Sequence, residues 1–250
     1  MRQSLPEDLL REDPPLFHFS EVPSTQNWLK ERLESNAFPP ATAVVAERQT
    51  AGRGRPGNTW HHLPGNLAMS LWIPQDKTRM ALPWTILTAH SVLLVLERAM
   101  GKVFGIKYPN DIIILESGLK VGGILVESMG EKGDLIGIGL NRNTPPISGA
   151  GGMVVSGKPL PPGPLELPFW IQNVILEHFG GGFSAQDLLS FLDDRLLWKG
   201  QWISFSEGGR GARIGKILGL GERGHLRVLD PQGIEFLLPV TVRDVRRVTP

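Results

Sequence analysis

The stretch KVGGILVESMGEKGDLIGIGLN, Lys120 to Asn141, contains two apolar runs on either side of a polar turn. Val, Ile and Leu dominate the runs Gly122 to Ser128 and Leu135 to Leu140, as is typical of strands buried in a sheet. The segment GEKGD, Gly130 to Asp134, has the glycines of a hairpin turn. Glu127 is a charge in an apolar run, which indicates either a partner Lys or Arg or an exposed edge. The stretch therefore predicts a hairpin of two buried strands.

More strands are predicted on both sides of this hairpin, and helices bracket them. The strands are expected at residues 41–47, 66–73, 103–107 and 112–115. The helices are expected at residues 22–33, 82–100, 169–179 and 184–198, the last opened by a Ser184 cap. Helices that bracket strands joined by tight turns indicate an α+β fold, a mixed β-sheet with helices packed on one face.

The composition changes twice in the second half of the chain. From Asn143 to Pro168 it is rich in Pro and Gly with little periodicity, as in a long functional loop or a disordered insert. From Gln201 to Val248 short strand-like segments alternate with glycines and a DPQG turn, which is the spacing of a small β-barrel. We therefore expect two domains, residues 1–199 and residues 200–250.

The overall composition excludes several classes of protein. The chain has 250 residues and a formal net charge of +1, which disfavours a protein held on nucleic acid mainly by long-range charge. It has no cysteine, so disulfides, thiolate nucleophiles and Cys-ligated metal sites are excluded. No apolar run approaches the roughly 18 residues of a membrane span, and the first residues are charged and interrupted by proline. A cytoplasmic protein is expected.

Glycines and arginines alternate in AERQTAGRGRPGNTW, Ala46 to Trp60, directly after a predicted strand. The glycines let the backbone approach a ligand closely, and the guanidinium groups of Arg53 and Arg55 suit a carboxylate or a phosphate. The loop is therefore a candidate anion site. Taken alone, it fits somewhat better a mobile surface hairpin whose arginines are merely solvated.

Six short motifs give this loop a context: STQN, QTAGRGRPGNTW, PGNLAMSL, KYPND, LKVGGILVE and GIGLN, in this order. The set resembles the biotin protein ligases segment by segment over roughly Val22 to Asn141. The resemblance implies the biotin and lipoate ligase fold, similar to class II aminoacyl-tRNA synthetases, with a C-terminal SH3-like β-barrel. It also implies biotin as substrate and ATP with Mg²⁺ as cofactors. The chain has no P-loop motif, so ATP would bind by another geometry.

The resemblance also assigns residues to a biotin site. The matching positions are Ser24, Thr25, Gln26, Gln49, Gly52, Arg53, Gly54, Arg55, Lys120 and Gly123. Without it, Ser24 and Thr25 would be interpreted only as helix caps, and Gln49 as an ordinary residue at a strand end. Pro56 departs from the arginine often found in the family, which implies a stiffer loop with one cation fewer.

Lys120 and Arg55 are the expected catalytic residues. The resemblance places the Lys120 ammonium between the biotin carboxylate and the α-phosphate, where negative charge builds up during the reaction. The resemblance also implies that Arg55 retains the activated intermediate in the site. Without the resemblance, a lysine at a turn is usually just solvated.

The nucleotide is expected to contact Arg55, Trp60, Lys107, Asn110 and Asn141, and Asp111 is the candidate Mg²⁺ ligand. Tyr108 stands where the family usually has tryptophan, and we expect it to keep an aromatic stacking wall. As a plain turn, Pro109 to Asp111 would carry no chemistry.

The implied reaction is a two-step acyl transfer. The biotin carboxylate attacks the α-phosphate of ATP to give biotinyl-5′-AMP, and a lysine of the biotin carboxyl carrier protein of a biotin-dependent carboxylase then displaces AMP. Only 23 residues precede Ser24, too few for the winged helix-turn-helix of the repressor members, so DNA binding is not expected. No membrane partner is expected, and edge strands leave a homodimer open.

Three rival functions remain on the residues alone. A lipoate or octanoate ligase or transferase on the related fold would need an extended apolar slot. A regulator that binds biotin without turnover would not need both Lys120 and Arg55. An RNA-binding module that uses GRGRPG would bind polynucleotides in a salt-sensitive way and ignore biotin.

Overall fold

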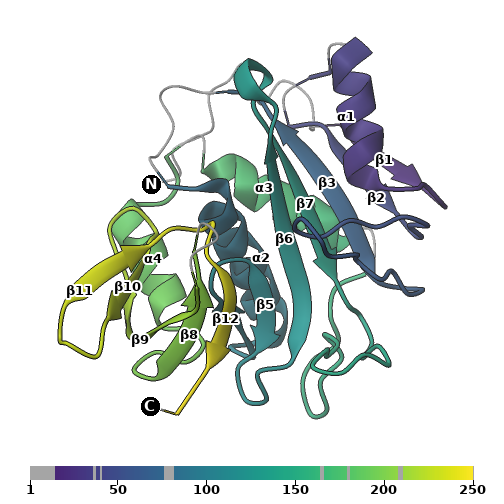
Figure 1. Ribbon diagram of the computed structural model, residues 1–250. Coiled ribbons are helices and arrows are strands. Elements are labelled where there is room, and N and C mark those ends of the chain that lie inside the picture. The colour runs from purple at the N-terminus through teal and green to yellow at the C-terminus, as the bar shows by residue number, and fades with distance from the viewer. Residues whose placement is uncertain are drawn as a thin grey trace.

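The computed structural model describes residues 15–35, 38–39, 41–75, 82–163, 166–178, 181–207 and 211–249. A seven-stranded sheet forms the larger part of the molecule (Figure 1), with the strand order β1-β2-β3-β7-β6-β5-β4. Its strands are β1 (Leu16–Phe19), β2 (Ala43–Ala46), β3 (Leu67–Ile73), β4 (Phe104–Lys107), β5 (Asp111–Ile114), β6 (Lys120–Ser128) and β7 (Asp134–Leu140). β1 pairs with β2 in parallel and the other pairs are antiparallel, so the sheet is mixed as predicted.

The predicted hairpin lies inside this sheet. β6 and β7 pair in register from Gly122 opposite Leu140 to Ser128 opposite Asp134, and a 3₁₀ turn, Gly130–Lys132, joins them. β7 has buried apolar residues on both faces, since Ile136 and Ile138 belong to the main core whereas Leu135 packs with Leu29 and Leu33 on the other face. β1 was not predicted; it is a short edge strand whose phenylalanines, Phe17 and Phe19, pack against Trp28.

Four helices flank the large sheet and its junction with the C-terminal part: α1 (Thr25–Ser35), α2 (Trp84–Met100), α3 (Glu166–Glu177) and α4 (Ala185–Asp193). Alternate residues of β2 show which face each helix covers. Ala43 and Val45 belong to the main core with α2 and α3, whereas Val44 packs with Leu29 and Leu33 of α1. The expectation that the helices pack on one face is therefore wrong for α1, which covers the opposite face (Figure 1). β2 is apolar on both sides and needs a cover on each.

Each of the four predicted helices differs from the structure in at least one of its bounds, most of all α4. The Ser184 cap is confirmed, since its Oγ accepts from the Asp187 N–H at 3.0 Å, but α4 ends at Asp193 instead of Trp198. The following residues leave the helix because they pair with β4, where Ile106 N donates to Arg195 O at 2.9 Å. α3 begins at Glu166, three residues before the predicted start at Phe169. The predicted end at Phe179 lies outside the described residues.

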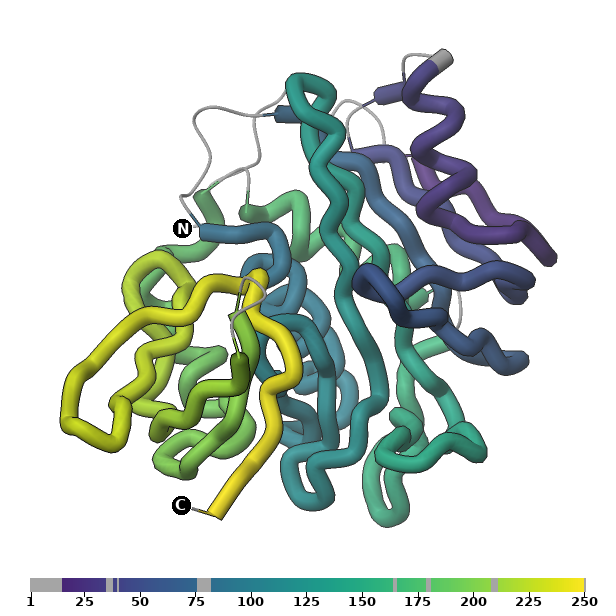
Figure 2. Tube along the Cα trace, in the orientation of Figure 1, coloured from purple at the N-terminus to yellow at the C-terminus, as the bar shows by residue number. Residues whose placement is uncertain are grey.

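A second, antiparallel sheet of five strands follows, in the order β11-β10-β9-β8-β12. Its strands are β8 (Trp202–Ser206), β9 (Arg213–Leu220), β10 (Leu226–Leu229), β11 (Glu235–Leu238) and β12 (Arg243–Arg247). The Cα trace shows this sheet beside α4 (Figure 2), and one continuous apolar core runs from Leu96 and Ile106 to Phe205 and Leu238. The α+β fold with a small C-terminal β-domain is confirmed, and the domain boundary near Lys199 stays a prediction.

Two buried histidines lie between α2, α3 and α4. The imidazole rings of His90 and His178 are 5.3 Å apart, and His178 Nε2 shares a 3.0 Å hydrogen bond with Ser91 Oγ. Burial lowers the pKa of His90 to about 3 and the pKa of His178 to about 4, and the neighbouring His178 ring and the charge of Arg195 contribute to the lower pKa of His90. Both rings are therefore neutral in the folded protein at neutral pH.

Acid is expected to weaken the fold between about pH 6.5 and pH 4. The unfolded chain binds protons on both imidazoles near pH 6.5 and the folded chain does not, so the free energy of unfolding falls as the pH drops through this window. His90→Phe keeps a ring at the site and removes one titration, so it should flatten the pH dependence. Urea unfolding at several pH values measures this, and equal slopes for the variant and the unmodified protein would contradict it.

None of the helices in the described ranges is both long enough and apolar enough to pass through a bilayer.

Candidate active site

A cavity of about 540 Å³ lies on the sheet face opposite α2 and α3, next to the start of α1. Its floor contains Gly123 of β6 and Gly137 and Gly139 of β7, which alternate with the core residues Ile136 and Ile138. Strand β3, the glycine-arginine loop and β12 complete the walls. Backbone rather than side chains therefore forms much of the floor.

The floor glycines let larger side chains lie directly on the sheet. A Cβ atom at Gly139 would stand 2.5 Å from the Trp60 indole, and one at Gly137 would stand 2.8 Å from Gln26 Oε1. Trp60 and Gln26 therefore occupy the space that any other residue would fill. The Trp60 Nε1–H is buried and finds no hydrogen-bond partner among the described residues.

A buried polar network forms one end of the cavity. Gln49 Oε1 accepts from Thr25 N at 2.8 Å and from Thr25 Oγ1 at 3.1 Å, which ties the start of α1 to the end of β2. Thr25 Oγ1 lies 2.8 Å from Ser70 Oγ, which donates to Gln26 Oε1 at 2.9 Å. Ser24 accepts weakly from Asn27 N at 3.4 Å, so its capping role is confirmed. These contacts fix hydroxyl and amide groups in a buried corner, where they match the polar edge of a small ligand.

The glycine-arginine loop forms a hairpin over the cavity. Arg53 pairs with Thr59, Gly54 N donates to Asn58 O at 3.0 Å, and Trp60 N donates to Gly52 O at 3.0 Å. A Cβ atom at Gly52 would stand 2.5 Å from the Trp60 carbonyl, so the close approach of the two arms needs glycine there. We call residues 52–60 the lid hairpin.

Arg55 joins the lid hairpin to the segment that enters β12. Its Nη2 donates to Thr241 O at 3.1 Å and to Val242 O at 2.8 Å, and its Nη1 donates to Asn110 Oδ1 at 3.1 Å. Burial and the charge of Arg243 lower the pKa of Arg55. A guanidinium has five N–H groups, so donors remain for an anion in the cavity.

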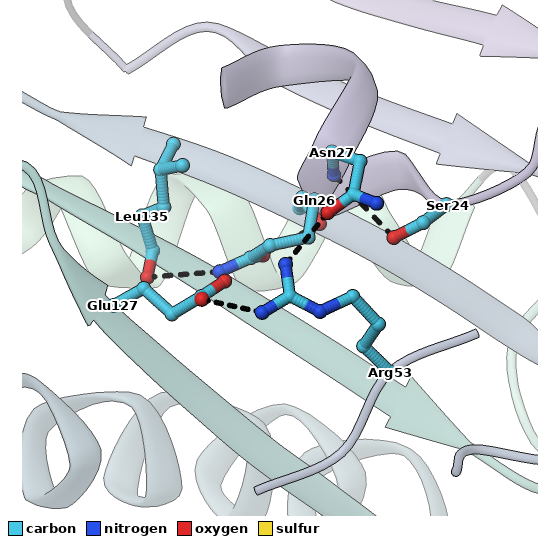
Figure 3. Close-up of polar contacts among 7 residues, drawn as sticks. Ser24, Gln26, Asn27, Arg53, Glu127 and Leu135 are labelled. Atoms are coloured by element: carbon cyan, nitrogen blue, oxygen red, sulfur yellow. Dashed lines mark hydrogen bonds and ion pairs between the residues drawn. The ribbon is translucent and has the colours of Figure 1, made fainter. Parts of the chain in front are cut away.

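Arg53 lines the cavity and also binds two side chains of the protein itself. Its Nη1 donates to Asn27 Oδ1 at 2.6 Å and its Nη2 donates to Glu127 Oε1 at 2.7 Å (Figure 3). The guanidinium thus binds a carboxylate, as the residue type indicated, but the carboxylate belongs to β6. Of the two readings of Glu127, the buried partner is confirmed, since β6 is an interior strand.

Lys120 lies at the other end of the cavity from the polar network, with Asp111. Its Nζ is 2.6 Å from Asp111 Oδ1, and its side chain passes 3.5 Å from the Cβ position of Gly123. Lys120 N donates to Gly149 O and Gly151 N donates to Lys120 O, so the Pro- and Gly-rich segment holds its backbone. The arrangement places an ammonium on the floor beneath the lid hairpin, next to one carboxylate.

Two of the residues expected at the nucleotide, Asn141 and Lys107, lie outside this cavity. Asn141 does not line the cavity, because its amide accepts from Asn66 Nδ2 at 3.0 Å and donates to Gly151 O at 3.2 Å. Lys107 lines a smaller adjoining cavity of about 220 Å³ with Tyr108. Burial raises the pKa of Tyr108, and its hydroxyl donates to Leu238 O at 2.9 Å. The ring therefore anchors the C-terminal sheet and forms no stacking wall in the main cavity.

The residues present do not fit a metal ion held by the protein alone. The described part of the chain contains no group of three or more His, Cys, Asp or Glu side chains that could hold one. Asp111 Oδ1 already accepts from Lys120, and Asn110 Oδ1 from Arg55.

Three polar cavity residues outside the glycine-arginine loop were absent from the sequence prediction: Ser70, Arg243 and Asp244. Ser70 could have been found from the sequence, since it is the one residue with a hydroxyl group in the apolar run of β3. No sequence pattern points to Arg243 and Asp244, because only the packing of the C-terminal sheet brings β12 to the cavity.

Comparison with known proteins agrees with this geometry. Residues 18–143 match the sequence pattern of the Biotin/lipoate A/B protein ligase family. The bifunctional ligase/repressor BirA of Bacillus subtilis is 41% identical over 137 residues, which cover 52% of this chain and 41% of that protein. The biotin–[acetyl-CoA-carboxylase] ligase of Paracoccus denitrificans is 37% identical over 114 residues, 43% of this chain and 47% of that protein. The chain thus spans less than half the length of these curated relatives.

Solved structures extend the similarity over nearly the whole chain. The biotin protein ligase of Aquifex aeolicus in complex with biotin and ATP superposes with a TM-score of 0.76 at 27% identity, covering 94% of this chain and 99% of that one. The biotin protein ligase of Leishmania major with biotin superposes with a TM-score of 0.65 at 26% identity, covering 90% and 99%. Since the family match spans half of the sequence and includes both the lid hairpin and Lys120, the chain belongs to the biotin/lipoate A/B protein ligase family.

Proposed function

We propose that this protein activates biotin with ATP and transfers it to a lysine of a biotin carboxyl carrier domain. The observation that carries the proposal is one cavity with a buried neutral polar corner at one end and the Lys120 ammonium at the other, both beneath the lid hairpin. A molecule with a polar ring system and a carboxylate tail matches that order. The relatives named for biotin, and the Aquifex structure with biotin and ATP, support it.

The polar corner is the proposed site of the biotin ring. Thr25, Gln26, Gln49 and Ser70 offer hydroxyl and amide groups that donate and accept, as a cyclic urea requires. The unpartnered Trp60 Nε1–H is one further donor at the cavity wall. Of the other positions expected to contact biotin, Ser24, Gly54 and Gly123 also line the cavity, whereas Gly52 supports the hairpin.

The first step is a displacement at phosphorus. A biotin carboxylate oxygen forms a bond to the α-phosphorus of ATP, the bond to the bridging oxygen breaks, and pyrophosphate leaves with the electron pair. The two reactants are both anions, so a cation between them lowers the barrier. Lys120 supplies that cation, and the anions compete with Asp111 for its three N–H groups. The spare donors of Arg55 face the same charge.

The second step breaks the mixed anhydride. The lysine amine of the carrier attacks the biotin carbonyl carbon, the bond to the phosphate oxygen breaks, and AMP leaves while the amine loses a proton to solvent. The lid hairpin shields the intermediate from water until then. The nucleotide is proposed to lie along Arg55, Trp60 and Asn110, with Mg²⁺ arriving on its phosphates, and no step is assigned to a metal held by Asp111.

Biotin-dependent exchange of labelled pyrophosphate into ATP tests the proposal. We expect exchange with biotin and none with lipoate or octanoate, followed by a mass gain on one lysine of a biotin carboxyl carrier domain. Exchange with octanoate or lipoate but not with biotin would show that the substrate is one of those acids and not biotin. Tight biotin binding without exchange would leave a binding protein in place of an enzyme.

A further inference from the structure

Arg53 reaches out of the lid hairpin and is held by two other elements. Figure 3 shows its guanidinium between Asn27, in the first turn of α1, and Glu127, on β6. The distances are 2.6 Å from Nη1 to Asn27 Oδ1 and 2.7 Å from Nη2 to Glu127 Oε1. Hydrogen bonds between ionised groups are roughly twice as strong as neutral ones. We call these three residues the Arg53 clasp.

The partners of Arg53 stand outside the cavity. Arg53 is among the residues that line it, whereas Asn27 and Glu127 are not. A bound ligand would therefore meet the lid hairpin but neither partner. Any effect of Asn27 or Glu127 on the ligand must pass through Arg53.

The position of Glu127 is unfavourable for a charged side chain. It lies in an interior strand with 23% of its side chain exposed, and its Oε2 is buried without a hydrogen-bond partner in the described part of the chain. Burying a carboxylate is unfavourable unless it is paired. Arg53 is the cation that pairs with Glu127 in the described part of the chain, so this pairing requires the lid hairpin to lie over the cavity.

We propose that Glu127, with Asn27, is a positioning residue that holds the lid hairpin over the cavity through Arg53, and that opening the Arg53 clasp is the step that admits and releases the ligand. The identity of the ligand rests on the proposed function, but the clasp itself does not. The strength of the clasp then sets how long the cavity stays closed.

Hydrogen exchange on the ligand-free protein tests the clasp without any assumption about function. The amides of Gly54, Asn58 and Trp60 are bonded within the lid hairpin. In Glu127→Met we expect them to exchange about three to ten times faster, because the clasp is charge-assisted but its arginine is 40% exposed and partly screened. The milder Glu127→Gln keeps an acceptor oxygen and should give a smaller increase.

The chain offers a matched control. Arg48 and Glu21 form a similar ion pair at 2.6 Å, on the surface and away from the cavity. Glu21→Met should leave exchange in the lid hairpin unchanged. Unchanged exchange in Glu127→Met, or an equal rise throughout the molecule, would overturn the clasp.

Biotin release measured by stopped flow extends the test to the ligand. Arg53→Met and Glu127→Met should each speed release about three- to tenfold, and the double variant should be no faster than either single one, since both remove one interaction. Additive effects, or an effect of Arg53→Met alone, would mean that Arg53 meets the ligand directly and would overturn the proposal. If the unmodified protein binds no biotin while the exchange result holds, the proposed function fails and the clasp stands.

Discussion

Lys120→Ala is expected to lower biotin-dependent pyrophosphate exchange by about two to three orders of magnitude, the usual loss when one charge-stabilising group is removed from an active site. Lys120 Nζ is 2.6 Å from Asp111 Oδ1. Removing the ammonium therefore also leaves the Asp111 carboxylate unpaired on the cavity wall. Two anions would then have to react beside a third, without the cation that joins them.

A second variant separates these two effects. In Lys120→Ala with Asp111→Asn, the repelling carboxylate is gone, so part of the lost exchange should return. Lys102→Ala removes an exposed lysine between α2 and β4 and should leave the rate unchanged. A single Lys120→Ala variant with exchange within a few-fold of normal would remove Lys120 from the proposed chemistry.

Gly139→Ala is expected to weaken biotin binding by about one to two orders of magnitude. The new Cβ atom would stand 2.5 Å from Trp60 Cε2 and 2.9 Å from Trp60 Nε1, so the indole and the lid hairpin that carries it must move. Overpacking of this kind costs about 1–3 kcal/mol, and 1.4 kcal/mol is a factor of ten in affinity. Isothermal titration with biotin measures the change.

Trp60→Ala tests the cause. Once the indole is absent, the extra methyl group has room, so Trp60→Ala with Gly139→Ala should bind biotin as well as Trp60→Ala alone. Gly211 has open space around its Cβ position, and Gly211→Ala should bind normally. A further loss in the double variant would show that the methyl group disturbs the floor rather than the lid.

Local patterns predicted the centre of the fold. The β6–β7 hairpin and the Ser184 cap depend on residues close together in the chain, and both were predicted correctly. The short edge strand β1 has too few residues to show a period, and its pairing with β2 depends on a partner more than twenty residues away. Similarly, the position of α1 on the opposite face follows from which side of β2 it can cover, which sequence periodicity does not show.

In the site, too, some features could be predicted from the sequence and others could not. The motif order predicted that the lid hairpin, Gln49 and Lys120 would meet, and all of them line one cavity. The partners of Arg53 and Arg55 could not be predicted, because a guanidinium donates to several kinds of acceptor at many sequence separations. The sequence suggested that both arginines bind an anion, and the structure gives each a different anchor.

The contacts that hold Arg53 and those that hold Arg55 respond differently to substitution of their partners. Arg53 is held by side chains, so a single substitution at Asn27 or Glu127 can remove its hold. Arg55 bonds one side chain, Asn110, but its other two contacts are the carbonyl oxygens of Thr241 and Val242, which every amino acid supplies. The C-terminal sheet lies beyond the region of family sequence similarity, yet the fold similarity extends over it. A substitution at Thr241 or Val242 therefore changes a side chain but leaves the carbonyl oxygen that holds the lid hairpin.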